Sequence, residues 1–304
     1  GAWTEALLRR NDIVMGFGPV EGDAEVERIL EYAAARGAMT FALPGRVGSF
    51  ACDAATTHPF MHQELIEILY HTLWESVHVF FEHRELGYDV GDAAFLYPFL
   101  GQERQESGTL VADVAKSITM KVQDDSRLRV QVAAEEGTAI VEATRAIGER
   151  IKAGGKLLTF GNGGSATDAN DLAIDCVSPP LGMRPVPAVS LSMEPANVTA
   201  IANDVGLDVV FVRQMIAHAE KGDVAFGIST SGGSKNVIAA LAEARKRGLL
   251  TVALLGYDGG EIRRRGLADV SIVVSSDYIP RIQEVQASIY HIIREGLEDA
   301  HAEG

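Results

Sequence analysis

The chain has 304 residues, of which 47% are hydrophobic and 23% charged, enough for one large hydrophobic core or two modest ones. Its net charge of −15 and its isoelectric point near 5.0 argue against a nucleic-acid or anionic-membrane partner, because a strongly acidic surface repels phosphates. Cys52 and Cys176 make no disulfide framework, no apolar run is long enough to span a membrane, and the first residues lack a signal-peptide pattern. We therefore expect a cytoplasmic protein that contacts neither nucleic acid nor membrane.

β-rich apolar runs alternate with helical patterns along the chain, which is typical of an α/β fold with a parallel sheet. We divide the chain into a segment at residues 1–101, a linker at 102–108 and a larger unit at 109–304. In the larger unit the apolar runs predict strands at Lys156–Phe160, Ala188–Leu191, Val224–Ile228, Leu250–Leu255 and Val270–Val274. The helical patterns lie at Leu110–Gln123, Arg127–Ala153, from the first glycine turn to about Val177, Asn197–Asn203, Val209–Lys221, Asn236–Arg247 and Arg281–Ala300.

The N-terminal segment repeats the second half of the larger unit. With a shift of 211 positions, residues 11–17 align with residues 222–228, and the register holds over 35 positions. After a deletion of nine residues, a Gln-Glu pair and a later His also align. These aligned pairs are Gln63 with Gln283, Glu64 with Glu284, and His71 with His291. Because matching strands alone would be common among α/β units, the shared register favours a partial duplication.

The repeated segment has lost the hydroxyls of the turn that it copies. Where the larger unit has Ser229–Ser234, the first copy has Gly18–Asp23, which includes Glu21 and Asp23. Two carboxylates would repel a phosphate at this helix start. We therefore expect a structural role for residues 1–101 and no phosphate site there.

Two serine- and glycine-rich turns, Gly161–Ser165 and Ser229–Ser234, each follow a short apolar strand and open a helical pattern. The start of a helix offers unpaired N–H groups and the positive end of the helix dipole, which suit a phosphate. Glycine allows a close backbone approach, and the hydroxyls add neutral donors. No Lys follows the glycines and no GxGxxG is present, so neither turn is a nucleotide-binding loop. The pattern predicts a site for the phosphate monoester of a small metabolite.

Asp171 and Asp175 lie four residues apart on the helix that Ser165 opens, so both project from one face. These carboxylates could share a metal, or one could act as a general base. An exposed acidic helix face is the alternative explanation. Gln283 and His291 lie on an otherwise apolar C-terminal helix, where a lone His is more often a buried core residue than a functional one. Asp204 closes a predicted helix and could belong only to a turn.

The unit from about 110 to 300 resembles the sugar isomerase (SIS) fold and, within it, the phosphoheptose isomerases. The motifs that carry the resemblance occur in the family's order along about two-thirds of the chain. They are residues 152–156, Gly161–Ser165, residues 202–204, residues 227–234, residues 256–260 and residues 281–284. The resemblance implies a three-layer α-β-α domain with a parallel five-stranded, flavodoxin-like sheet, preceded here by half a SIS domain. It also implies a homo-oligomer, a dimer or tetramer, with sites at subunit interfaces.

The resemblance assigns roles to residues of this chain. It implies that the sugar phosphate is bound by the two turns, the residues being Gly163, Gly164, Ser165, Ser229, Thr230, Ser231 and Ser234. Asn162 and Asp204 would line the sugar site, and Gln283 and His291 would lie at the reacting end. Some family members carry zinc, which Asp171, Asp175, Gln283 and His291 could bind in this chain. The reaction itself requires no cofactor.

Four positions depart from the family's pattern. Asp175 stands where the isomerases have a catalytic Glu, and Asp171 stands where they have a His that is often a zinc ligand. Pro179 replaces an Arg that approaches the substrate, and Pro280 replaces an Asp. Asp175 keeps the carboxylate but shortens its reach by about one methylene, and an error of about 1 Å can cost on the order of 100-fold in rate.

These residues lead to three hypotheses. The first is an aldose–ketose isomerase that converts sedoheptulose 7-phosphate to D-glycero-D-manno-heptose 7-phosphate through an enediol, with Asp175 and His291 as acid/base residues. The second is a non-catalytic phosphosugar-binding or assembly protein, because one relative of the subfamily has lost the catalytic pair and binds the bacterial replication initiator. The third keeps catalysis but changes the substrate, because Pro179 replaces a substrate-facing Arg.

Overall fold

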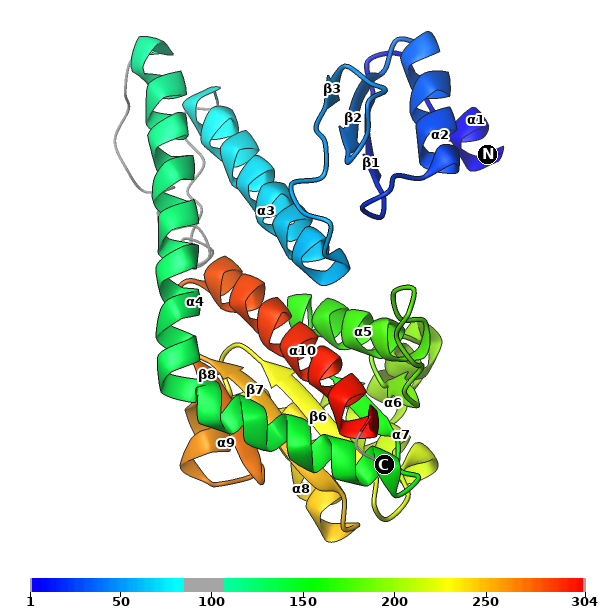
Figure 1. Cartoon of the computed structure of the whole chain (residues 1–304), viewed down its shortest axis with the longest axis vertical. Helices are drawn as coiled ribbons and strands as arrows, with labels where there is room; N and C mark the ends of the chain where they lie inside the picture. The colour runs from blue at the N-terminus through cyan, green and yellow to red at the C-terminus, as the bar shows by residue number, and fades with distance from the viewer. Residues whose placement is uncertain (1, 85–106, 303–304) are drawn as a thin grey trace. The chain divides into compact units, whose positions relative to one another are not determined.

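The computed structural model describes residues 2–84 and 107–302, which belong to two compact units, Gly1–His78 and Val79–Gly304 (Figure 1). The end of the expected N-terminal segment at residue 101 and most of the expected linker, residues 102–106, lie outside the described residues. Ser107 and Gly108, which we expected in the linker, begin a helix instead.

The first unit is a small α/β unit with a parallel sheet of order β1-β2-β3. Helix α2 packs on β1 and β2 and covers one face of this sheet. The elements are α1 (Ala2–Leu7), β1 (Ile13–Phe17), α2 (Ala24–Ala35), β2 (Met39–Leu43), β3 (Phe50–Ala51) and most of α3 (Pro59–Arg84), which continues six residues past the end of the unit at His78.

The second unit contains a parallel five-stranded sheet of order β5-β4-β6-β7-β8. Chain order thus reverses beside β4, which makes the sheet doubly wound and flavodoxin-like, as the sequence predicts. The first elements are α4 (Ser107–Lys152), β4 (Leu157–Phe160), α5 (Gly164–Val177), β5 (Ala188–Ser190), α6 (Pro195–Val205), a 3-10 turn (Leu207–Val209) and α7 (Val210–His218). The others are β6 (Val224–Ser229), α8 (Lys235–Lys246), β7 (Leu250–Gly256), α9 (Gly260–Arg264), β8 (Val270–Val274) and α10 (Ile279–Ala302).

The two units share topology and strand register. Ile13 on β1 pairs with Met39 on β2, and Val224 on β6 pairs with Leu250 on β7, so both partners differ by 211 residues between the units. The pair β2–β3 corresponds to the pair β7–β8, in which Phe41 pairs with Phe50 and Val252 pairs with Val270. Phe41 and Val252 again differ by 211 residues, whereas Phe50 and Val270 differ by 220, which is nine more. Helices α3 and α10 begin 220 residues apart, which equals the shift of 211 plus the same deletion of nine residues. The register agrees with the alignment of the two copies, whose common origin stays a prediction.

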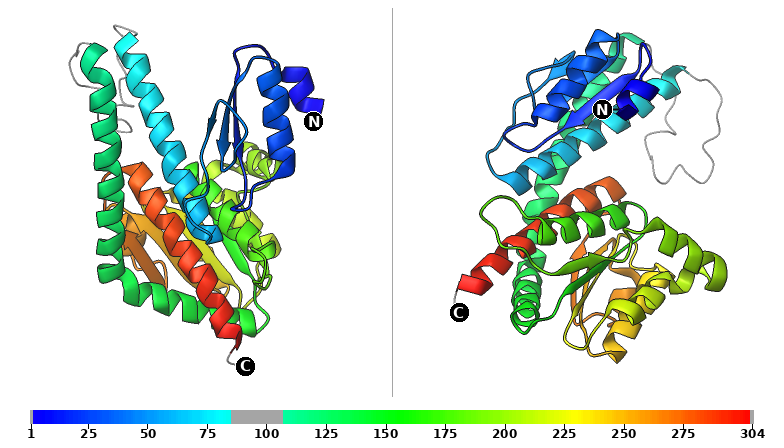
Figure 2. Two further views of the ribbon diagram at one scale, coloured as in Figure 1. Left: turned by 45° about the horizontal axis from the view of Figure 1, so that its top comes forward. Right: turned by 90° about the vertical axis from the view of Figure 1, so that its right-hand side faces the viewer.

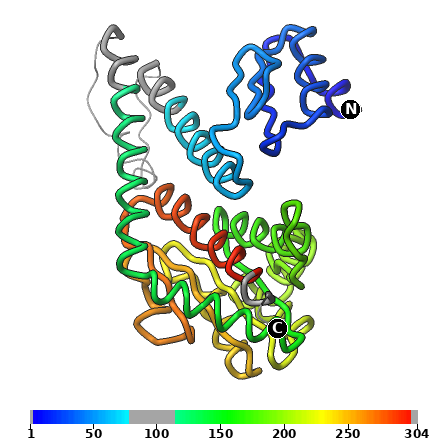
Figure 3. Tube along the Cα trace, in the orientation of Figure 1, coloured from blue at the N-terminus to red at the C-terminus, as the bar shows by residue number. Residues whose placement is uncertain are grey.

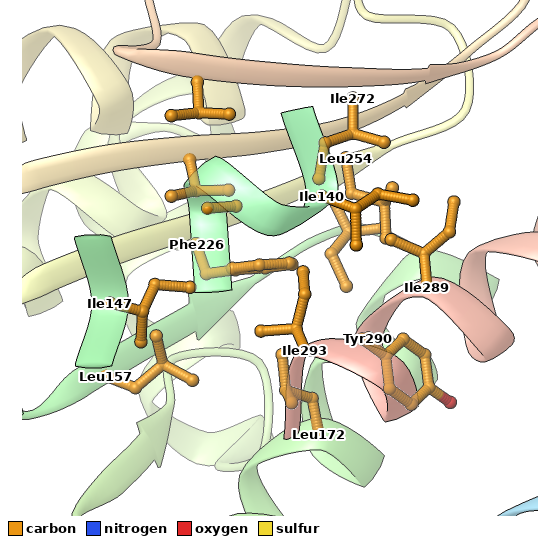
Figure 4. Close-up of a cluster of buried hydrophobic side chains, with 14 of the residues drawn as sticks. Ile140, Ile147, Leu157, Leu172, Phe226, Leu254, Ile272, Ile289, Tyr290 and Ile293 are labelled. Atoms are coloured by element: carbon orange, nitrogen blue, oxygen red, sulfur yellow. The ribbon is translucent and has the colours of Figure 1, made fainter. Parts of the chain in front are cut away.

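Helices cover both faces of the five-stranded sheet, which gives the three layers expected from the sequence (Figure 2). Helices α4, α5 and α10 pack on one face, where Phe226, Ile272 and Tyr290 contribute to a buried cluster (Figure 4). Helices α7, α8 and α9 pack on the other. Full burial of each large apolar side chain contributes roughly 1.5–3 kcal/mol, so these two clusters fix the sheet and the helix ends around it.

Helix α4 is one continuous element, although the sequence predicts two helices separated near residues 124–126. Figure 3 shows that it bends part-way along its length. Asp124, Asp125 and Ser126, which lie between the two predicted helices, are residue types typical of helix starts. In the structure, Arg127 pairs with Asp124 and Arg129 pairs with Asp125 along the helix, so these carboxylates support the helix rather than cap a new one.

No helix within residues 2–84 and 107–302 is both long enough and apolar enough to cross a membrane.

Candidate active site

The two serine- and glycine-rich turns lie at the carboxyl ends of β4 and β6, which are adjacent in the sheet. The chain leaves β4 for α5 on one face of the sheet and leaves β6 for α8 on the other face. Such a divergence opens a crevice at the carboxyl ends of the strands, which is where open α/β sheets bind their ligands. The topology therefore brings the two turns together at the expected ligand position.

The first turn ends in α5, whose N-cap is Gly163 with φ 57°, a left-handed conformation that favours glycine. Gly164 and Ser165 form the first turn of the helix, and Ser165 is buried. A Cβ on Gly164 would overlap the side-chain amide of Gln283, so a larger residue here would displace that amide. The amide of Gln283 thus lies against the start of α5.

The second turn is held by its own hydroxyls. Ser229 is buried, and its Oγ lies 3.3 Å from Ser234 Oγ and accepts a hydrogen bond from the backbone N–H of Gly232 at 3.2 Å. Ser234 is the N-cap of α8, and its own side chain forms no capping hydrogen bond to the helix. The N–H groups at the start of α8 are therefore available to an anion, except that of Val237, which donates to Asn236 Oδ1.

An asparagine pair joins the two turns. Asn162 Nδ2 donates to Asn236 Oδ1 at 2.8 Å, and Asn236 Nδ2 donates to Asn162 Oδ1 at the same distance. Asn236 is buried on the first turn of α8 and also accepts from the N–H of Val237. This reciprocal amide pair sets the separation of the two helix starts. The sequence predicts Asn162 as a sugar-site residue and does not single out Asn236.

The corresponding turn of the first unit, Gly18–Asp23, differs because a carboxylate caps the helix that follows it. Asp23 is the N-cap of α2, and its Oδ1 accepts from the N–H groups of Glu25 and Val26 at 2.8 and 2.9 Å. The carboxylate therefore occupies the position that an anion would take at this helix start. This geometry supports the expectation that the first copy binds no phosphate there.

The two candidate acid/base residues meet where α5 packs against α10. Asp175 Oδ2 lies 3.4 Å from His291 Nε2, and the two residues are 9% and 2% exposed. The spacing of Gln283 and His291 places both on the side of α10 that contacts α5, since Gln283 reaches Gly164 and His291 reaches Asp175. We call this contact, from Gly164 to Asp175 on α5 and from Gln283 to His291 on α10, the α5–α10 seam.

Asp171 lies one helical turn before Asp175 and interacts electrostatically with both Asp175 and His291. Burial, together with the like charge of Asp175, raises the pKa of Asp171 to about 6, and His291 opposes this rise. A carboxyl group with a pKa near neutrality is suited to proton transfer. The exposed acidic face that was the alternative explanation therefore does not describe these two aspartates.

The metal-ligand set expected from the sequence does not assemble into a ready metal site. Asp175 and His291 are in contact, whereas Gln283 lies against the start of α5. Within the described residues, no three His, Cys, Asp or Glu side chains come together in an arrangement that could hold a metal ion. Zinc binding stays a prediction.

Three residues that the sequence predicts to bind the sugar phosphate are less buried than Ser165 and Ser229. Asp204 is exposed at the end of α6, where its carboxylate accepts from Asn203, and the described part of the chain shows no hydrogen bond from it to either turn. Thr230 is half-buried, and exposed Ser231 accepts from the N–H of Gly233. Ser231 also faces an open depression at the ends of β7 and β8, lined by Arg263 among others.

Comparison with known proteins addresses the larger unit. The model of the SIS domain matches residues 123–256. The phosphoheptose isomerase of Citrifermentans bemidjiense is 44% identical over 184 residues, which is 60% of this chain and 95% of that protein. The chain belongs to the phosphoheptose isomerase family. The family member from Pelobacter propionicus is 43% identical over 60% of this chain and 96% of its own length.

Solved structures of phosphoheptose isomerases have the same fold. That of Neisseria gonorrhoeae has a TM-score of 0.58 and 31% identity, and the match covers 61% of this chain and 99% of that one. That of Francisella tularensis has the same TM-score with 27% identity, covering 61% of this chain and 98% of that one. The matches thus extend over nearly the whole length of each phosphoheptose isomerase.

Proposed function

We propose that this chain is an aldose–ketose isomerase that interconverts sedoheptulose 7-phosphate and D-glycero-D-manno-heptose 7-phosphate. The proposal rests above all on the buried pair of Asp175, on the helix that the first phosphate turn opens, and His291 on α10, which lie 3.4 Å apart. Membership of the phosphoheptose isomerase family supports the substrate.

The phosphate lies at the start of α8, where Ser229 and Ser234 donate hydroxyl hydrogen bonds and the helix dipole favours a negative charge. Ser165 and the N–H groups at the start of α5 face the same crevice. At 1.5 Å of rise per residue, Asp171 and Asp175 lie roughly 9 and 15 Å along α5 from Ser165. The anion site and the acid/base pair are therefore separate along α5, as binding a sugar phosphate by its two ends requires.

The α5–α10 seam carries out the proton transfers. The Asp175 carboxylate removes a proton from C1 of the ketose, and the C=C bond of the enediol forms as the C2 carbonyl becomes a hydroxyl. His291 supplies the proton to that oxygen and removes the proton from the C1 hydroxyl as the new carbonyl forms. Asp175 then returns its proton to C2, so the enzyme ends in its starting state. Gln283 hydrogen-bonds to the sugar oxygens beside this pair.

The direct test is incubation of the purified protein with sedoheptulose 7-phosphate, followed by NMR of the heptose product. We expect conversion by the wild-type chain without added metal. Absence of conversion with and without added zinc would contradict the proposal.

A second candidate function is phosphosugar binding without turnover. It is favoured by one observation, the aspartates at 171 and 175 where the family's pattern has His and Glu. This candidate predicts that sedoheptulose 7-phosphate binds, that no product forms, and that the dissociation constant does not change in His291→Ala. The same NMR sample and a calorimetric titration separate the two functions.

We also propose that the chain is a homo-oligomer in the cytoplasm. Exposed apolar residues on α5 and α10, Ile174, Val177 and Ile292, lie on helices that form the α5–α10 seam, and their burial between subunits would stabilise an assembly. Free thiols at Cys52 and Cys176 suit a reducing compartment. Light scattering after size-exclusion chromatography tests the oligomer, for which we expect a dimer or tetramer.

A further inference from the structure

Arg294 lies three residues after His291 on α10, and none of its side chain is exposed. Its guanidinium contacts three different parts of the fold. Nε donates to the main-chain oxygen of Asp175 at 2.9 Å, one Nη donates to the main-chain oxygen of Arg184 at 2.5 Å, and the other Nη pairs with Glu298 Oε1 at 2.8 Å. Arg294 therefore connects α10, the end of α5 and the loop that leads to β5.

Burial of a guanidinium carries a large desolvation free energy. Removing a cation from water costs several kcal/mol, and an apolar side chain of similar volume is often as stable or more so. Arg294 recovers this cost only through its hydrogen bonds and its ion pair. An apolar side chain could not supply the guanidinium's N–H donors, which are held in a fixed planar geometry.

The carbonyl that Arg294 binds is one of the last in α5, where no later helical N–H group is available to it. The neighbouring carbonyl of Cys176 accepts from the N–H of Val186. The end of α5 is thus closed by two contacts, one from Arg294 and one from the following loop.

Arg294 and His291 hold opposite ends of the same residue. Arg294 binds the main chain of Asp175, and His291 contacts its carboxylate. An aspartate has a short side chain, so a small displacement of its main chain moves the carboxylate away from its partner by a similar distance.

We propose that Arg294 is a positioning residue for the isomerisation, which fixes the main chain of Asp175 so that its short carboxylate reaches the reacting carbon. This role rests on the proposed function, because it acts through Asp175. It does not involve the phosphate site at the start of α8.

The kinetic test compares Arg294→Met and Arg294→Lys with wild type, using sedoheptulose 7-phosphate as substrate and inorganic phosphate as competitive inhibitor. A misplacement of about 1 Å should lower kcat about 100-fold in Arg294→Met, with KM and the inhibition constant of phosphate within about twofold. Arg294→Lys keeps the charge and places N–H donors on a single nitrogen, so part of kcat should return.

Arg129→Lys is the matched control. Arg129 also binds α10, through the main-chain oxygen of Glu284 and the hydroxyl of Ser288, but it extends from α4 rather than from the α5–α10 seam. Its replacement should lower the melting temperature and leave kcat within about twofold. An unchanged kcat in Arg294→Met, or an equal loss in Arg129→Lys, would overturn the proposal.

Crystal structures of the same variants decide the question without turnover. In Arg294→Met, or in Arg294→Lys if the Met variant does not fold, the Asp175–His291 distance should lengthen from 3.4 Å, whereas in Arg129→Lys it should not. An unchanged distance in the Arg294 variants would overturn the positioning role. Failure of the wild-type protein to convert the substrate would instead contradict the proposed function.

Discussion

Asp175 and His291, which are 116 positions apart in the sequence, place a carboxylate oxygen and an imidazole nitrogen 3.4 Å apart in a nearly dry environment. Both side chains are oriented by helices whose starts adjoin the carboxyl edge of the same sheet. A proton can therefore be exchanged between a bound sugar and this pair with little competition from water.

Removal of either member of this pair should abolish turnover and preserve phosphate binding. General acid–base groups contribute roughly 10²–10⁴-fold, so Asp175→Asn and His291→Ala should each lower kcat at least about 100-fold. Steady-state kinetics measure the loss. A calorimetric titration with inorganic phosphate should give the wild-type affinity, and a parallel loss of phosphate binding would show that the two ends of the site are not separate.

Loss of one hydroxyl at the start of α8 should weaken substrate binding and leave kcat nearly unchanged. A hydrogen bond to a charged group contributes about 1.5–3 kcal/mol, so Ser234→Ala should raise KM about 10-fold or more while kcat changes little. Thr199→Ala is the control, because that hydroxyl bonds to Pro195 on exposed α6. Equal KM values for the two variants would remove Ser234 from the phosphate site.

Gly164→Ala should damage the site through Gln283. The added Cβ overlaps the Gln283 amide, so Gln283 or the start of α5 must move, and kcat/KM should fall. Gly137→Ala, in the middle of α4, meets nothing within 4 Å and should instead stabilise the protein by up to about 1 kcal/mol. Kinetics and urea unfolding of both variants make the comparison, and normal kcat/KM in Gly164→Ala would contradict the close approach.

Asp171 should make stability depend on pH. Its pKa rises from 3.8 to about 6 on folding, so between these values the folded state binds the proton more tightly. Its ionisation therefore costs stability, in full above pH 6 and not at all well below pH 3.8. Asp171→Asn should melt higher than wild type at pH 8, and the difference should shrink as the pH falls through 6.

Asp204→Asn, at an exposed position on α6, is the control for this experiment. A melting-temperature difference in Asp171→Asn that stays constant from pH 8 to pH 4.5 would contradict the raised pKa.

The amide pair that joins the two turns should show energetic coupling. Asn162→Ala leaves the buried Asn236 amide without its partner, and Asn236→Ala does the same to Asn162. Asn162→Ala should cost about 1–3 kcal/mol of unfolding free energy, because a buried amide is left unsatisfied, and Asn236→Ala should cost less for this reason, because Asn162 is exposed to water. The double variant should lose little more than one single variant, and fully additive losses in urea unfolding would contradict the coupling.

The sequence predicts much of this arrangement because its signals are local. Glycine turns at strand ends, alternating strands and helices, and the spacing of Gln283 and His291 all act within one or two elements. The shared register of β1–β2 and β6–β7 is also visible in the sequence, since a gap-free shift of 211 positions preserves which residues pair.

What the sequence could not predict depends on contacts between distant elements. Arg294 resembles any basic residue near the end of a helix, and only the packing of α10 on α5 buries it against Asp175. Asn236 follows a lysine in an ordinary helix start, and its partner is 74 residues away. The predicted break near residue 125 was wrong. In the structure, the ion pairs of Asp124 with Arg127 and of Asp125 with Arg129 lie along one continuous helix.

Isomerisation in D2O tests the central claim most directly, because an enediol formed by Asp175 exchanges its abstracted proton with solvent. NMR of the heptose product made by the wild-type protein should show deuterium at C2, and Asp175→Asn should form neither product nor deuterated substrate. Formation of deuterated product by Asp175→Asn at the wild-type rate would contradict proton transfer by this carboxylate.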